Sequence, residues 1–111
     1  MKLEHFLQSL KNLGLIKWYS PYCYYYQQFS YCDCSSSIIT VRINTRKCMI
    51  WQNFRINDEG EITVINLDRH LYDIDSEGDI VINKVIEMIK LYKQIKIELK
   101  KKLKEIENDF Q

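Results

Sequence analysis

The chain has 111 residues, of which 46% are hydrophobic and 28% are charged, and its formal net charge is +1. This balance and the scarcity of glycine and proline exclude a disordered chain, and the length is that of one domain, residues 1–111, with its own core. No segment approaches the about 18 apolar residues of a membrane span, and the N-terminus lacks the apolar region of a signal peptide, so we expect a cytoplasmic protein.

Residues 1–14 are predicted to form a short amphipathic helix. Leu3, Phe6 and Leu10 recur three or four positions apart, which places them on one side of a helix. Gly14 follows where the end of a helix favours a left-handed residue.

Residues 17–82 are predicted to form an antiparallel meander of four to six strands. Aromatic residues and cysteines crowd residues 22–34, and β-branched residues alternate with polar ones over residues 39–44. Residues 44–47 suit a hairpin turn. Alternation resumes over residues 48–56 with large side chains on both sides, so both faces of the sheet are expected to be partly covered.

Two segments within this region resemble each other. Ile56–Val64 and Ile74–Ile82 both place an acid-rich stretch around a Glu-Gly pair and end in alternating or continuous β-branched residues. We predict two hairpins that turn at Gly60 and Gly78. The second hairpin makes Ile80–Ile82 a strand, because Ile-Val-Ile favours extended backbone.

Residues 83–110 are predicted to form one long helix, capped by Asn83. The alternative begins the helix near Asp79, with Ser76 and Asp79 as a capping box. The expected fold class is therefore α+β: a short N-terminal helix, an antiparallel meander, and a long C-terminal helix packed on the sheet and partly projecting.

The apolar stripe of this helix narrows at Lys96, which occupies a position that should be apolar. After Lys96 the stripe is a seam edged by charges, as in helices that pair, and a polar residue at one core position can fix register and oligomer state. We predict a homodimer with residues 96–110 as the dimerisation segment. The predicted seam consists of Leu99, Leu103, Ile106 and Phe110. The alternative packs these turns along the N-terminal helix of the same chain.

Charge is segregated along the chain. Residues 51–79 carry eight Asp and Glu against two Arg, whereas the segments before and after them are basic. Such an acidic block favours a protein partner with a basic, nucleic-acid-binding surface. The predicted contact residues are Asp58, Glu59, Glu61, Asp68, Asp73, Asp75, Glu77 and Asp79. Small proteins of this general character occur among phage and mobile-element products, including anti-CRISPR-like inhibitors of host defence proteins, so we expect a non-enzymatic inhibitor of this kind.

Consecutive tyrosines between residues 22 and 31 have three interpretations. Most strand aromatics belong to the core or the sheet surface, but tyrosines also mark protein interfaces. Next to basic residues they can stack on single-stranded RNA or DNA. This alternative function, a single-stranded nucleic-acid-binding module, uses Tyr24, Tyr26, Arg42, Arg46 and Lys47.

Metal binding and catalysis have weaker signals. The four cysteines lack a Cys-x-x-Cys knuckle, which favours small buried side chains over a zinc site. Residues 73–80 resemble the first eight of an EF-hand calcium loop, but Lys84 stands where that loop needs a bidentate Glu. Neither His5 nor His70, which we place in a loop, adjoins a nucleophile in a recognisable motif. We expect no metal, no cofactor and no enzymatic activity.

Overall fold

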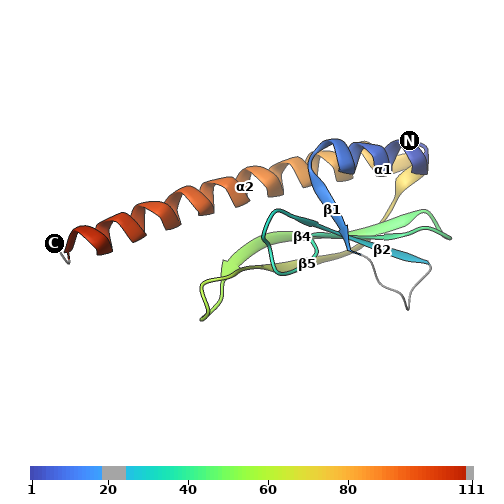
Figure 1. Ribbon diagram of the computed structural model, residues 1–111. Helices are drawn as coiled ribbons and strands as arrows, with labels where there is room; N and C mark the ends of the chain where they lie inside the picture. Colours follow the sequence, from blue (N-terminus) through green and yellow to red (C-terminus); the bar gives the residue numbers. More distant parts are fainter. Residues whose placement is uncertain (19–24, 110–111) are drawn as a thin grey trace.

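A computed structural model describes residues 1–18 and 25–109. These residues form a five-stranded antiparallel sheet and two helices that lie side by side over one face of it (Figure 1). In chain order the elements are α1 (Leu3–Asn12), β1 (Leu15–Trp18), β2 (Tyr26–Tyr31), β3 (Ile39–Arg42), β4 (Lys47–Ile56), β5 (Ile62–Asp73) and α2 (Ile74–Asp109). The predicted α+β architecture is confirmed, with sheet order β1-β2-β3-β4-β5.

Helix α1 forms where the spacing predicts it. Phe6 and Leu10 are completely buried against the sheet and α2, whereas the polar side of the helix faces outward. The helix ends at Asn12, and Gly14 has a φ of +92°, a backbone conformation that favours glycine.

Cross-strand pairs of apolar residues form the centre of the core. Ile39 pairs with Ile50 and Val41 with Cys48, and all four are buried on the face that the helices cover. The predicted hairpin turns before Lys47 and at Gly60 are confirmed. At the second turn Gly60 has a φ of +80°, and the Asn57 side chain accepts bonds from the amides of residues 59 and 61.

Strand β5 continues through the residues that the sequence placed in a loop around His70. Its pairing with β4 is irregular: Ile50 pairs with Asp68 and Cys48 with Tyr72, so β5 contains two extra residues here. This bulge keeps Asp68 and Tyr72 on the same face of the sheet.

The predicted hairpin at Gly78 and the strand Ile80–Ile82 are wrong, and both predicted helix starts are too late. Helix α2 begins at Ile74. The reason is burial at helical spacing, because Ile74, Val81 and Val85 all point into the core and are fully buried. Gly78 serves close packing, since a Cβ added there would lie 3.0 Å from Cβ of Met1.

Helix α2 crosses β4 and β5 and then continues past the sheet (Figure 1). Its 36 residues span about 54 Å at roughly 1.5 Å per residue. The radius of gyration is 16.0 Å, larger than the roughly 13 Å of a compact domain of this size. The predicted projection of the helix is confirmed.

Candidate interaction surfaces

The face of the sheet opposite the helices, called the outer face here, carries no helix in the described parts of the chain (Figure 1). Strand alternation and register assign to it Ile16, Trp18, Tyr26, Thr40, Arg42, Lys47, Met49, Trp51, Arg55 and Leu67. Four large members are well exposed, at 53% for Ile16, 41% for Trp18, 43% for Tyr26 and 37% for Leu67. On β4, Met49 and Trp51 of the outer face are half-buried, as expected for a strand with both faces partly covered.

Three of the five residues predicted to bind nucleic acid meet on the outer face. Arg42 lies directly across from Tyr26 on one side and Lys47 on the other. Its guanidinium carbon is 5.5 Å from the centre of the Tyr26 ring, and its Nε is buried without a hydrogen-bond partner in the described residues. Arg46 instead pairs with Asp75 at 3.2 Å, and Tyr24 lies outside the described residues.

The predicted acidic contact residues do not form one surface. Three of them, Asp58, Glu59 and Glu61, lie at the tip of the β4–β5 hairpin. The group Asp73, Asp75, Glu77 and Asp79 lies at the start of α2, near the opposite end of the sheet, with Asp68 between the groups on β5 (Figure 1). These acids belong to one block of the sequence, but they are far apart in the structure because β5 runs the length of the sheet between them.

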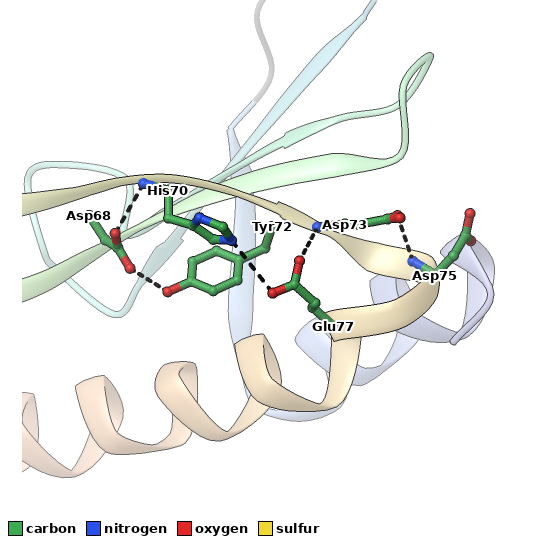
Figure 2. Close-up of polar contacts among 6 residues, drawn as sticks. All are labelled: Asp68, His70, Tyr72, Asp73, Asp75 and Glu77. Atoms are coloured by element: carbon green, nitrogen blue, oxygen red, sulfur yellow. Dashed lines mark hydrogen bonds and ion pairs between the residues drawn. The ribbon is translucent and has the colours of Figure 1, made fainter.

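Two of the four acids near the start of α2 stabilise that helix end. The Asp73 side chain accepts a bond of 3.2 Å from the amide of Asp75, and Glu77 accepts one of 3.2 Å from the amide of Asp73 (Figure 2). The other Glu77 oxygen lies 3.5 Å from Nε2 of His70. These contacts satisfy backbone donors that the first turn of a helix leaves unpaired.

Asp68 and Tyr72, at the bulge of β5, form a second polar contact close to the acids at the start of α2. The Tyr72 hydroxyl donates a hydrogen bond to Asp68 across the bulge (Figure 2). This bond lowers the pKa of the Asp68 carboxyl and, together with burial, raises the pKa of Tyr72 to about 12. Asp68 is therefore a structural partner of Tyr72.

Replacing Asp73 by alanine should lower the free energy of unfolding by about 1 kcal/mol, because the first turn of α2 loses its cap. Urea denaturation followed by circular dichroism measures this loss. Asp79→Ala is the matched control, since Asp79 is exposed and caps no amide in the described residues, and should change stability by less than about 0.5 kcal/mol. Equal effects of the two changes would contradict the assigned cap.

The polar position in the apolar stripe of α2 has an intrachain explanation. Lys96 pairs with Asp33 at 2.6 Å, and its amine lies 5.8 Å from the centre of the Tyr92 ring. The Tyr92 hydroxyl also donates to Asp33. The bond from Lys96 lowers the pKa of Asp33. Lys96 thus ties α2 to the turn after β2 of its own chain, and its predicted role in fixing the register of a dimer stays a prediction.

The cysteines and the EF-hand-like segment do not assemble a metal site in the part of the chain that the structure describes. Cys34 and Cys48 are buried in the core, whereas Cys32 is exposed. Cys23 lies outside the described residues. The EF-hand-like segment is helical from Ile74 onward and so does not form the calcium-binding loop it resembles.

A cleft of about 220 Å³ opens where α2 leaves the sheet. Phe54 and Ile56 of β4 form one wall, and Ile95 and Leu99 of α2 form the other. Beyond the cleft, residues 99–109 of α2, called the α2 tail here, extend away from the sheet (Figure 1). Leu103 and Ile106 of the predicted seam are 59% and 53% exposed on this tail, whereas Phe110 lies outside the described residues.

Comparison of the chain with protein-family models, curated proteins and solved structures found no match. Among the described helices, none has the length and apolar character needed to cross a membrane.

Proposed function

We propose that the protein acts without catalysis, by binding a protein partner stoichiometrically through the outer face of its sheet. The observation that carries this proposal is the exposure of Trp18, Tyr26 and Leu67 on a face that no described helix covers. Aromatic residues, Met and Arg are the side chains enriched at the centres of protein interfaces, and all occur on this face. The aliphatic side chains of Ile16 and Leu67 suit a protein surface better than a nucleic acid.

The charges of the outer face indicate which kind of protein surface it fits. Arg42, Lys47 and Arg55 give it a basic character, with Asp73 at its edge. This favours an acidic or neutral partner patch, in place of the basic partner surface expected from the acidic block. An inhibitor of a host defence protein, anti-CRISPR-like and encoded by a phage or mobile element, is the form of the proposal that the small size favours.

The polar clusters support a role without catalysis. His70 and Glu77 belong to the contacts that hold the start of α2, and Asp33 and Lys96 hold α2 against the sheet. Each cluster thus has a structural purpose.

The test compares partner capture by two matched double variants in a lysate of the organism that carries the gene. Tyr26→Ala with Leu67→Glu changes the outer face, whereas Tyr25→Ala with Ile80→Glu makes the same changes at exposed positions elsewhere. We expect the first variant to lose a specific, stoichiometric partner at least tenfold and the second to retain it. Equal capture by both, with unchanged circular dichroism, would contradict the proposal.

A second candidate, binding of single-stranded nucleic acid, is favoured by one observation, the stacking of Arg42 on Tyr26 beside Lys47. It predicts that a fluorescein-labelled uridine 20-mer binds at low salt and weakens steeply as salt rises, because phosphate contacts release counterions. Arg42→Glu should abolish this binding, and Lys93→Glu, on the solvent side of α2, should weaken it little. Fluorescence anisotropy at two salt concentrations decides between the candidates.

A further inference from the structure

The apolar stripe of α2 continues past the part that packs on the sheet and is broken only at Lys96. Successive residues three or four apart run from Val85 through Tyr92 and Leu99 to Ile106, all on one side of the helix. Side chains of the stripe up to Tyr92 are buried, Leu99 is half-buried, and Leu103 and Ile106 are exposed. The tail therefore carries a core-type seam with no core against it.

The cleft and the α2 tail together form one apolar surface. In Figure 1 the tail and the β4–β5 hairpin diverge, so the tail does not close onto the hairpin of its own chain. Ile56 on the hairpin is 44% exposed, and it faces the cleft with Phe54. A second helix placed between hairpin and tail would cover Ile56, Leu99, Leu103 and Ile106 together.

The first turns of the α2 tail and the hairpin tip carry charges of opposite sign. The tail carries Lys100, Lys101, Lys102 and Lys104 near the cleft and Glu105, Glu107 and Asp109 farther along, whereas the hairpin tip carries Asp58, Glu59 and Glu61. The ion pairs in the described residues involve none of these groups. At the tip, Glu59 raises the pKa of the Glu61 carboxyl, as expected for crowded acids that a neighbouring cation would relieve.

We propose that the α2 tail of one copy packs into the cleft of a second copy, next to its hairpin tip, and that the exchange is reciprocal. In each half of this two-fold dimer, the seam of one copy packs in the cleft of the other copy. The lysines of that tail then lie near the acids of the other copy's hairpin tip. The size of a stable interface supports including the hairpin in the contact between the two copies. The tail alone offers about ten residues, whereas a stable interface needs roughly 20 to 30 on each side, and tail and hairpin together supply about that number.

This dimer does not rest on the proposed binding function, because it uses a surface on the other side of the sheet. Sedimentation equilibrium of the full chain at about 10 to 100 μM should give twice the chain mass. Leu103→Glu with Ile106→Glu should weaken association at least tenfold. Ile97→Glu, an exposed apolar residue on the opposite side of the same helix, should leave the dimer intact. A wild-type monomer at 100 μM would overturn the proposal.

A charge exchange tests the reciprocal arrangement itself. One variant carries Lys100→Glu and Lys104→Glu, and the other carries Asp58→Lys and Glu59→Lys. Each should dimerise at least tenfold more weakly alone, and mixing the two should restore a heterodimer, because each tail then meets a hairpin of opposite charge. If the hairpin variant dimerised as tightly as the wild type, tails would pair only with tails and the cleft would be excluded as their site. Circular dichroism of each variant verifies that the fold is intact.

Discussion

Tyr92→Ala should lower the free energy of unfolding by about 3 to 5 kcal/mol, the usual cost of truncating a large buried aromatic side chain. Tyr92 is only 3% exposed and lies where α2 crosses the sheet. Its ring makes edge-to-face contacts with Tyr31 and Phe54, at centroid distances of 5.2 and 5.8 Å. Alanine would leave a cavity between α2, β2 and β4 and would remove the hydroxyl that donates to Asp33.

Tyr92→Phe separates the ring from the hydroxyl. It keeps both aromatic contacts and removes one hydrogen bond to a carboxylate that Lys96 still neutralises, so the expected loss is about 1 to 2 kcal/mol. Urea denaturation of the three proteins at one protein concentration provides the comparison. If Phe destabilised as much as Ala, the polar contact would dominate and the packing role assigned to the ring would be wrong.

The fold was predictable where local spacing agrees with the tertiary structure. The i, i+3, i+7 pattern of Leu3, Phe6 and Leu10 marks α1, and the alternation around Ile39 and Val41 marks β3. The stripe of α2 was long enough to predict that the helix extends past the sheet. In each case the buried face is determined by neighbours within a few positions along the chain.

The resemblance between Ile56–Val64 and Ile74–Ile82 shows where local reasoning fails. The first segment forms the hairpin at Gly60, whereas the second is helical throughout. The difference lies in distant contacts: Ile74 and Val81 are buried beside α1, and Met1 packs on Gly78. These contacts outweigh the β-propensity of Ile-Val-Ile, which is a weak preference.

The candidate surfaces were predictable only in part for the same reason. Tyr26, Arg42 and Lys47 come from three strands, and the proposed nucleic-acid site combined them on charge and aromatic character alone. Their neighbours Trp18 and Leu67 join the outer face through strand register, which composition does not specify. The predicted acidic residues do not form one surface, because β5 places the two ends of the acidic block at opposite ends of the sheet.

Cys48 should make the protein less stable as the pH rises above 9. Its thiol is fully buried, and burial, with a smaller effect of the Glu77 carboxylate, raises its pKa from 9.0 to about 12. Between these values the unfolded chain releases a proton that the folded chain retains, so rising pH favours unfolding. The stability due to this group is complete below pH 9 and is lost progressively toward pH 12. By pH 10.5 the loss should be about 2 kcal/mol, at about 1.4 kcal/mol per pH unit.

Cys48→Ala isolates this effect from the titration of tyrosines and lysines, which both proteins share. At pH 8 the variant should be the less stable protein, because it leaves a small cavity in the core. Its free energy of unfolding should fall by about 2 kcal/mol less than that of the wild type between pH 8 and pH 10.5, when both are measured by urea denaturation under reducing conditions. Parallel pH dependence in the two proteins would mean that the thiol titrates normally and is accessible to water. Thiol labelling at pH 8 gives an independent measure, since exposed Cys32 should react quickly and Cys48 only as fast as the protein unfolds.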